Sequence, residues 1–372
     1  MTEPSCPHAT AAAAAAAERV PDARQASARE ALPEDYPGRI VAFPEDVTHM
    51  VSAMYGFQSR TPGAADAQRQ ALQALFALPD GPGWVERAHY VDPQGHACDI
   101  LLAYWVGRDA YLRWSASEAP ARWWRELPAD PAGGSGFWRE VMSAHKDRFQ
   151  YAAGTDEPAS AAALLPMVGS KKFGYWGSYR DRFAASRGDN FASPHKEMPD
   201  AVARDTLGRR IRITTPDNIC FIREGQGWER ALEAERAIWT DKMEQVVAQW
   251  VAALQQDPKV TGGLSIRFCR EQDVASGAER EKQSQFGFLL SLGHIEKAAR
   301  THATHLCVRS SFIDMYTEPK FAPQMHIWVE AQILKRDELD AQYINCHPHT
   351  GLLPYFEASE VPAGCAVRFA AD

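Results

Sequence analysis

Two histidines near the C-terminus, His305 and His326, have the residue type that most often binds metals and moves protons. They belong to two separate apolar segments, residues 306–316 and 325–334, that we read as strands. Imidazole is a ligand for iron and for zinc. With an ordinary pKa of about 6.5, a second imidazole donates and recovers a proton near neutral pH. The pair therefore suggests one axial metal ligand and one distal acid/base group.

Simpler interpretations of these histidines stay open. His302 and His305 have a His-x-x-His spacing that also suits a surface position at a helix end, and no third ligand with a zinc spacing is nearby. Cys307 is an alternative thiolate ligand, although inside the expected strand it would act as a small hydrophobe. His326 alternates with Trp328 on one side of a strand, where a hydrogen-bonded structural histidine is an ordinary outcome.

Two further segments carry charged side chains among aromatic residues and glycines. Residues 174–183 read GYWGSYRDRF, in which Arg180 and Arg182 face one side if the run is extended. Residues 218–228 read NICFIREGQGW, which we read as a strand that ends near Glu224 in a glycine turn. The plain alternatives are a strand with a solvated basic edge and a solvent-facing glutamate.

The elements that must position these residues are short strands mixed with amphipathic helices. Apolar runs predict strands at 100–105, 210–213, 218–222 and 286–292, and helices after Asp109 and at 295–300. The strongest helix covers about 232–254, because its large apolar residues recur at steps of three, four or seven. This mixture predicts an α+β fold of sheets backed by helices. A strand-then-helix order in both parts of the chain suggests two related halves, about 37–205 and 206–372.

Composition narrows the class of partner. The 372 residues contain 40 Lys plus Arg against 48 Asp plus Glu, a net charge of -8. This charge argues against a nucleic-acid partner, which requires a basic face. No apolar stretch approaches the roughly 18 residues of a membrane helix.

The seven cysteines are odd in number and include no Cys-x-x-Cys pair, so a reducing cytoplasm is expected. Residues 1–36 read as a flexible Ala-rich arm before a domain at 37–372. A solvent-exposed Ala-rich helix is the alternative.

The order of the segments resembles one family. The run GYWGSYRDRF is followed by DNICFIREGQGW (217–228), THL (304–306), the strand with His326, and YINCHPHTGLL (343–353). This succession resembles the aldoxime dehydratases, haem-containing lyases that convert aldoximes to nitriles. The resemblance covers roughly residues 38–358 and is densest after Gly174. Within the last segment, the plain reading of the His-Pro-His run is a structural turn.

The resemblance implies a ferredoxin-like fold of the dimeric α/β-barrel type and a homodimer. It also implies haem b, ferrous in the active state and held without the thioether links of a Cys-x-x-Cys-His run. His305 would be the proximal ligand of the iron, which binds the substrate nitrogen. His326 would be the distal acid/base group, and Arg182, rather than Arg180, would hydrogen-bond the oxime oxygen.

Two positions depart from the family pattern. The family carries a serine at the position of Glu224 and a glutamate near the position of Gln150. An ionised Glu224 accepts but does not donate hydrogen bonds, and turned inward it is expected to pair with Arg182. We therefore include Glu224 among the catalytic residues. A related enzyme acting on another N–O or N–N substrate, and a non-catalytic haem-based sensor, remain the alternatives.

Overall fold

The computed structural model describes residues 38–173, 177–317 and 323–369. The arm expected at 1–36 lies outside the described residues. Strands and helices alternate along the chain, and all fourteen strands of the described part join one antiparallel sheet. The α+β class predicted from the sequence is therefore confirmed. No helix in the described ranges is long and apolar enough to cross a membrane.

The N-terminal unit has the element order β-α-β-β-α-β, with two helices in place of the last one. Its strands lie side by side in the order β5-β2-β4-β3. The elements are β2 (His49–Ser59), α3 (Asp66–Phe76), β3 (Trp84–Val91), β4 (Ala97–Val106), α4 (Arg108–Ala116), α5 (Glu118–Glu126) and β5 (Ser135–His145). Helix α4 begins after Gly107, so Asp109 lies in its first turn and does not cap it.

The C-terminal unit repeats this arrangement, with the equivalent strand order β12-β9-β11-β10. Its strands are β9 (Ile219–Gly227), β10 (Gly263–Gln272), β11 (Glu279–Leu289) and β12 (His326–Leu334). Its helices are α7 (Glu233–Ile238), the π-helical turn η5 (Trp239–Met243), α8 (Glu244–Gln256), α9 (Pro258–Thr261), α10 (Leu292–Thr301) and α11 (Ala303–Thr317). The long helix predicted at 232–254 is thus confirmed as the continuous stretch from α7 to α8.

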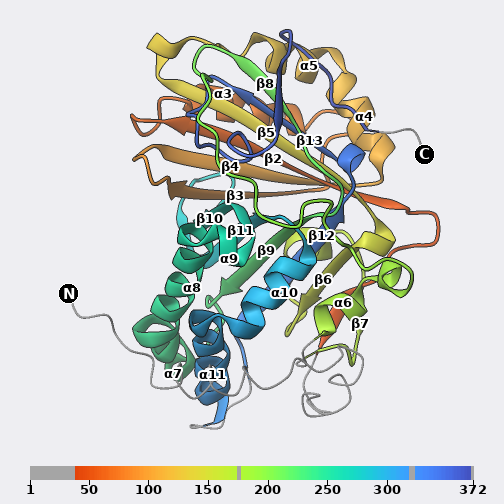
Figure 1. The fold of residues 1–372 in the computed structure, drawn as a ribbon, viewed down its shortest axis with the longest axis vertical. Helices are drawn as coiled ribbons and strands as arrows, with labels where there is room; N and C mark the ends of the chain where they lie inside the picture. The colour runs from red at the N-terminus through yellow and green to blue at the C-terminus, as the bar shows by residue number, and fades with distance from the viewer. Residues whose placement is uncertain (1–37, 174–176, 318–322, 370–372) are drawn as a thin grey trace.

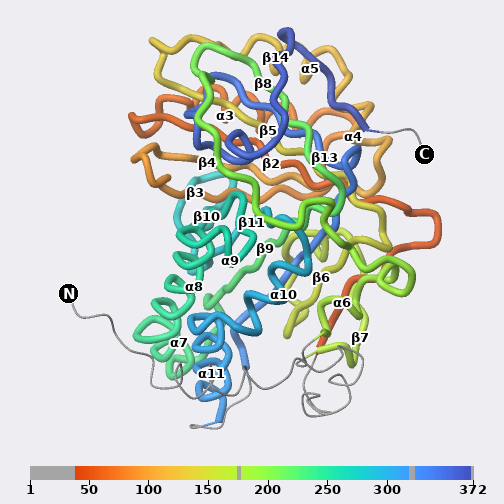
Figure 2. The backbone as a smooth tube through the Cα atoms, viewed as in Figure 1, coloured from red at the N-terminus to blue at the C-terminus, as the bar shows by residue number. Residues whose placement is uncertain are grey.

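The two units exchange strands. Strands β8 (Arg210–Thr214), β13 (Leu339–Ile344) and β14 (Glu357–Glu360) extend the N-terminal unit beyond β5. Strands β1 (Arg39–Val41), β6 (Phe149–Ala153) and β7 (Met167–Gly169) extend the C-terminal unit beyond β12. Figure 2 shows the blue β13 and green β8 among the red and orange strands of the N-terminal unit. Each unit therefore contains strands from both ends of the chain.

Short helices complete the described chain. They are α6 (Ser178–Arg182) and the 3-10 turns η1 (Pro131–Gly133), η2 (Lys146–Arg148), η3 (Ser160–Ala163), η4 (Ala184–Arg187) and η6 (Arg336–Glu338).

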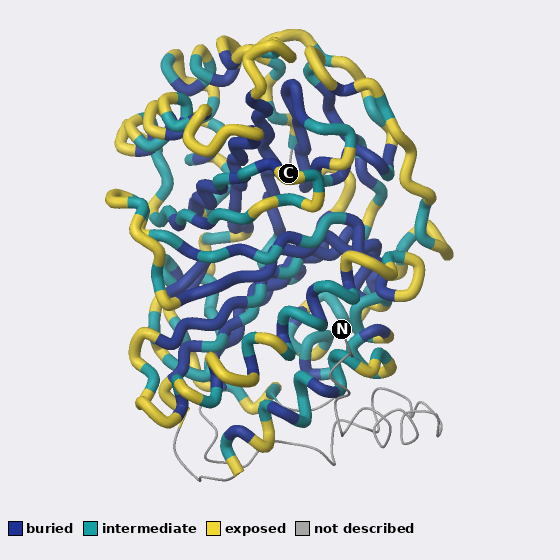
Figure 3. Tube along the Cα trace, turned by 90° about the vertical axis from the view of Figure 1, so that its left-hand side faces the viewer, coloured by how far each residue is buried: buried dark blue, intermediate teal, exposed yellow. Residues whose placement is uncertain are grey.

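The main core lies between the sheet portions of the two units. One apolar cluster joins Met54 and Trp138 of the N-terminal unit to Phe221, Phe286 and Trp328 of the C-terminal unit. The helices cover the outer sides. Figure 1 shows α3, α4 and α5 beside the N-terminal unit and α7 to α11 beside the C-terminal unit. In Figure 3 the buried residues run through the central strands. The C-terminal strands therefore have one side toward the shared core and one side toward helices.

Two predictions of local structure are wrong. Residues 306–316, read as a strand, lie in helix α11. Their β-branched and aromatic residues favour strands, but His305, Val308, Phe312 and Tyr316 also follow helical steps of three and four. Residues 178–182 of the GYWGSYRDRF run form helix α6, whereas Gly174 to Trp176 lie outside the described residues.

Candidate active site

The ladder between β9 and β12 separates the candidate residues into two groups. Directly paired residues of an antiparallel ladder point to the same side of the sheet. Glu224 pairs with Val329, and Gln226 pairs with Ile327. His326 pairs with Gly227 and Trp328 with Gly225, so both point to the other side. We call these sides the helix face, with Glu224, and the core face, with His326.

Apolar residues of the helix face are only partly buried, although helices cover this side. They are Ile222 of β9, Ile266 and Phe268 of β10, and Ile327 and Val329 of β12. Three of them, Ile266, Phe268 and Ile327, belong to the same apolar cluster as Val308 and Phe312 of α11. Accessible apolar surface therefore remains on the sheet and on α11, which suits a flat apolar ligand.

His305 lies on the stripe of α11 that carries Val308 and Phe312. Its Nδ1 is 2.7 Å from the carbonyl oxygen of Ala299, and its ring packs edge-on against Trp250, with the ring centroids 4.9 Å apart. Burial lowers the pKa of His305 to about 4, so the imidazole is neutral at neutral pH. Metal-binding histidines commonly have a neutral imidazole whose Nδ1–H donates to a backbone carbonyl, as here.

The two arginines of α6 have different roles because residues two apart lie on different sides of a helix. Arg180 forms an ion pair with Glu296 of α10, with 2.7 Å between Nη2 and Oε2, and also donates to the Asn190 carbonyl. Arg182 donates from Nε to the Gln150 side chain and from Nη1, at 2.8 Å, to the carbonyl of Lys172.

Gln150 places Arg182 beside the helix face. Gln150 pairs with Ala331 across β6 and β12, and Ala331 pairs with Ile222, so its side chain shares the side of the sheet that carries Glu224. The Arg182 guanidinium also lies over the Tyr179 ring, 4.7 Å from its centroid. The structure therefore brings Arg182, Gln150 and Glu224 to one side of the sheet.

Glu224 lies in the middle of β9, not at its end, and it is partly buried. Among the described residues, none makes a hydrogen bond or an ion pair with its carboxyl group, so the expected ion pair with Arg182 is not present. Burial raises the pKa of Glu224 to about 7. Burial is the main cause of the raised pKa of Tyr179. The charge of Glu224 raises this pKa further, and the charge of Arg182 lowers it. Sequence reasoning did not single out Tyr179, although it lies inside the GYWGSYRDRF run.

His326 is enclosed on the core face. Its ring stacks on Trp328 with centroids 4.7 Å apart, its Nδ1 is 2.6 Å from the Thr155 hydroxyl, and its Nε2 is 3.4 Å from the Tyr151 hydroxyl. Burial, with a smaller effect of Lys282, lowers the pKa of His326 to about 3. The shared side with Trp328 is confirmed. The structure does not bring His326 to Arg182 and Glu224, because the pleat of β12 points it toward the shared core.

The His-Pro-His run forms a turn after β13. Its histidines, His347 and His349, lie near each other and near His96. No group of three or more His, Cys, Asp or Glu in the described part of the chain is arranged to hold a metal ion. The predicted turn is confirmed, since the Thr350 N–H donates to the His347 carbonyl at 2.9 Å.

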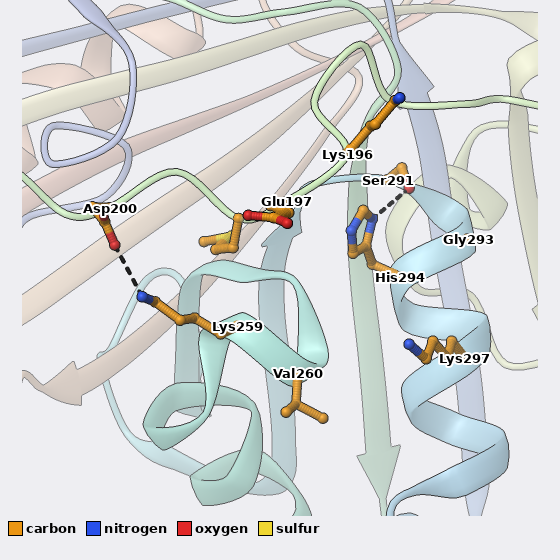
Figure 4. Close-up of a pocket in the computed structure, with 10 residues that line it drawn as sticks. Lys196, Glu197, Asp200, Lys259, Val260, Ser291, Gly293, His294 and Lys297 are labelled. Atoms are coloured by element: carbon orange, nitrogen blue, oxygen red, sulfur yellow. Dashed lines mark hydrogen bonds and ion pairs between the residues drawn. The ribbon is translucent and has the colours of Figure 1, made fainter.

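A separate pocket of about 490 Å³ lies at the N-terminal end of α10. Figure 4 shows its polar lining, with an ion pair between Asp200 and Lys259 and a hydrogen bond between Ser291 and His294. None of the residues predicted for the site lines this pocket.

Comparisons with known proteins identify the family of the chain. The family model of the haem-containing dehydratases matches residues 53–352. The chain is 30% identical to a phenylacetaldoxime dehydratase of Bacillus sp. (strain OxB-1), over 86% of this chain and 91% of that protein. It is 29% identical to an aliphatic aldoxime dehydratase of Pseudomonas chlororaphis, over 87% and 93% of the two chains.

A solved structure is similar over nearly the whole fold. The crystal structure of an aldoxime dehydratase in complex with butyraldoxime superposes with a TM-score of 0.77 at 27% identity, covering 88% of this chain and 94% of that one. The family match includes the strands of the candidate site and helix α11. This chain belongs to the family of haem-containing dehydratases.

Proposed function

We propose that this protein binds haem b between the helix face and α11 and dehydrates aldoximes, R–CH=N–OH, to nitriles and water. The observation that carries the proposal is the state of His305, a neutral imidazole whose Nδ1 is fixed by the Ala299 carbonyl. Such a residue suits an axial ligand of iron. The partly exposed apolar residues of the sheet and of α11 fit the apolar ring system of haem.

Bound ferrous haem would supply an electron-rich iron that holds the oxime nitrogen and weakens the N–O bond. The chain itself contributes Arg182, whose position next to Gln150 points to a role at the oxime oxygen. A fixed guanidinium stabilises negative charge that develops on the leaving oxygen. The apolar residues around Glu224 exclude water and receive the alkyl or aryl tail of the substrate.

The wider assembly is part of the same proposal. We interpret the two β-α-β-β-α-β units as ferredoxin-like halves of the dimeric α/β-barrel type, about 37–205 and 206–372 with strand exchange, and we propose a homodimer. A cytoplasmic location is part of this proposal. Cys98, Cys220, Cys269 and Cys346 are buried free thiols, as in a reducing compartment, whereas Cys307 is disulfide-bonded.

The function is tested with purified protein loaded with haem, reduced and kept anaerobic. Butyraldoxime and phenylacetaldoxime are added, the Soret band is recorded, and nitrile is measured by gas chromatography. We expect a Soret shift and nitrile formation well above a free-haem control. A Soret shift without nitrile from any aldoxime would refute dehydration and favour the sensor or another N–O or N–N substrate.

A further inference from the structure

We infer that Glu235 is a positioning residue of the haem site and holds helix α11 against the start of strand β12. The inference rests on the proposed binding of haem by His305 and adds to it the residue that fixes the ligand helix. Glu235 belongs to α7, and its side chain is fully buried. A buried carboxyl group is costly unless its oxygens accept hydrogen bonds, so the donors that it binds indicate its role.

The donors to Glu235 come from both ends of the connection between α11 and β12. Tyr316, near the end of α11, donates its hydroxyl hydrogen to Oε1 at 2.7 Å. The backbone N–H groups of Gln324 and Met325 donate to the same oxygen at 3.0 and 3.1 Å, and Gln324 also donates to Oε2 at 3.2 Å. Among the described residues, none forms an ion pair with this carboxyl group. Glu235 therefore links α7, α11 and the segment before β12 through hydrogen bonds alone.

Hydrogen bonds of this kind make a stiff link. An ionised carboxylate only accepts hydrogen bonds, and those that it accepts are shorter and stronger than bonds between neutral groups. The surroundings are apolar, since Met315, Met325 and Trp239 are buried in one cluster. In such surroundings a hydrogen bond is stronger than in water, and an unpaired polar group is costly. A movement of α11 away from β12 at this point would therefore break bonds that water does not readily replace.

Tyr316 lies on the side of α11 that carries the proposed iron ligand. It follows His305 by eleven residues, which is about three helical turns, so both side chains project from the same stripe of the helix. Phe312 of that stripe packs edge-on against Tyr316, with ring centroids 5.1 Å apart. The hydrogen bond to Glu235 therefore holds the face of α11 that is turned toward the proposed haem.

A second contact fixes the other end of α11. Trp250 of α8 packs edge-on against the His305 ring, with ring centroids 4.9 Å apart. Glu235 and Trp250 belong to the continuous helical stretch from α7 to α8, so this stretch runs antiparallel to α11 and contacts it at two points. Figure 1 shows α7 beside α11. Trp250 thus orients the ligand ring, whereas Glu235 fixes the far end of the ligand helix.

Strand β12 provides part of the opposite wall of the proposed haem site. Its Ile327 and Val329 side chains lie on the helix face, and Ile327 follows Met325 by two residues. Because Glu235 ties the start of this strand to the end of α11, it sets the separation of the two walls. Loss of the link is therefore expected to weaken haem binding and to alter the bond between His305 and the iron.

The test removes the link in graded steps. Glu235→Leu keeps the side-chain volume and removes both acceptor oxygens, whereas Glu235→Gln keeps one oxygen and tests rescue. Tyr316→Phe removes only the hydroxyl that α11 contributes. Glu338→Leu is the matched control, because Glu338 is also a buried glutamate that accepts from a backbone N–H, that of Lys335, but it lies in η6 beyond the opposite end of β12. Circular dichroism establishes that each variant folds, and Tyr316→Phe decides the test if Glu235→Leu does not.

Haem retention gives the first readout, measured as the rate at which haem leaves the loaded protein for an excess of apomyoglobin. We expect about tenfold faster loss in Glu235→Leu, as for one or two net hydrogen bonds, and a smaller increase in Tyr316→Phe. Glu235→Gln and Glu338→Leu should stay within about threefold of the unsubstituted protein. Unchanged haem loss in Glu235→Leu, or an equal increase in Glu338→Leu, would overturn the inference.

The bond between iron and histidine gives a second readout that does not require turnover. Resonance Raman spectra of the reduced, haem-loaded protein record its stretching frequency. We expect a shifted band in Glu235→Leu and Tyr316→Phe and an unchanged band in Glu338→Leu. A band that stays unshifted in both Glu235→Leu and Tyr316→Phe would overturn the inference. Absence of nitrile from any aldoxime, with both haem effects intact, would refute only the proposed reaction and would leave the role of Glu235 supported.

Discussion

Glu224 and His326 project from opposite sides of one two-stranded ladder. Glu224 is opposite Val329 on the side covered by α8, α10 and α11, whereas His326 stacks on Trp328 in the core shared by the two units. The register of β12 against β9 therefore sets which of the two side chains faces the helices and which faces the shared core.

Turnover should depend on pH through Glu224. Its pKa is raised by burial to about 7, above the ordinary value for glutamate, so the carboxyl group is protonated below that pH. A carboxylate opposes the negative charge that develops on the leaving oxygen, whereas a neutral carboxyl group does not, so kcat is expected to be high below pH 7 and to fall as pH rises through it. Stopped assays across pH 5.5 to 8.5 at saturating aldoxime measure the profile. A kcat that rises through pH 7 would contradict this effect of Glu224.

His305→Ala should prevent normal haem binding. The substitution removes the neutral imidazole that Ala299 orients, and α11 (Ala303–Thr317) contains no other histidine. We expect a large loss of bound haem, or a Soret band of altered ligation, with unchanged circular dichroism of the apoprotein. His302→Ala, three residues earlier on the adjoining helix end, is the matched control and should retain the normal spectrum. An unchanged spectrum in His305→Ala would reject the ligand assignment.

Substitution of Arg182 should affect catalysis, whereas substitution of Arg180 should affect stability. Arg182→Ala removes the guanidinium beside Gln150, and we expect kcat to fall by about 10²- to 10³-fold, as for the loss of one stabilising donor. Arg180→Ala breaks the ion pair with Glu296 that joins α6 to α10. It should lower the free energy of unfolding by roughly 1.5 to 3 kcal/mol and leave kcat within a few-fold. Steady-state kinetics and urea unfolding measure the two effects. A large loss of kcat in Arg180→Ala with normal kcat in Arg182→Ala would contradict these roles.

Gly225→Ala should destabilise the ladder without touching the helix face. A Cβ at Gly225 would overlap the indole of Trp328 on the core face, and overpacking of this kind costs about 1 to 3 kcal/mol. Gly188→Ala is the control, because its Cβ would meet no heavy atom within 4 Å and its φ is -127°. Thermal unfolding should show a clear decrease in Tm for Gly225→Ala alone. A Tm of Gly225→Ala equal to that of the unsubstituted protein would contradict the described packing of Trp328.

The sequence predicted the family and its cofactor, but only part of the fold around the candidate site. A continuous apolar run correctly predicts the strand at 100–105, alternation predicts the strand that begins at His326, and a stripe with helical spacing predicts α8, because each pattern reflects how the element is buried. The strand prediction for residues 306–316 is wrong because valine, isoleucine and aromatic residues fit both a strand and the apolar stripe of a helix.

The position of His326 could not be read from the sequence for a different reason. The period-2 alternation along the strand correctly predicts that His326 and Trp328 share a side, but it does not predict which side faces the helices. That choice depends on pairing with β9, a strand about a hundred residues earlier, and a shift of one residue would reverse it. The partner of Arg182 is likewise set by tertiary packing, because Gln150 belongs to a strand exchanged between the units.

The most direct test of the central claim is the stoichiometry of a single anaerobic turnover. One equivalent of butyraldoxime is mixed with an excess of the reduced haem-loaded protein, and butyronitrile and remaining aldoxime are quantified together. We predict one nitrile for each aldoxime consumed, with no net change in the oxidation state of the haem. Recovery of unreacted aldoxime, or consumption that yields aldehyde or amine in place of nitrile, would contradict the proposed dehydration.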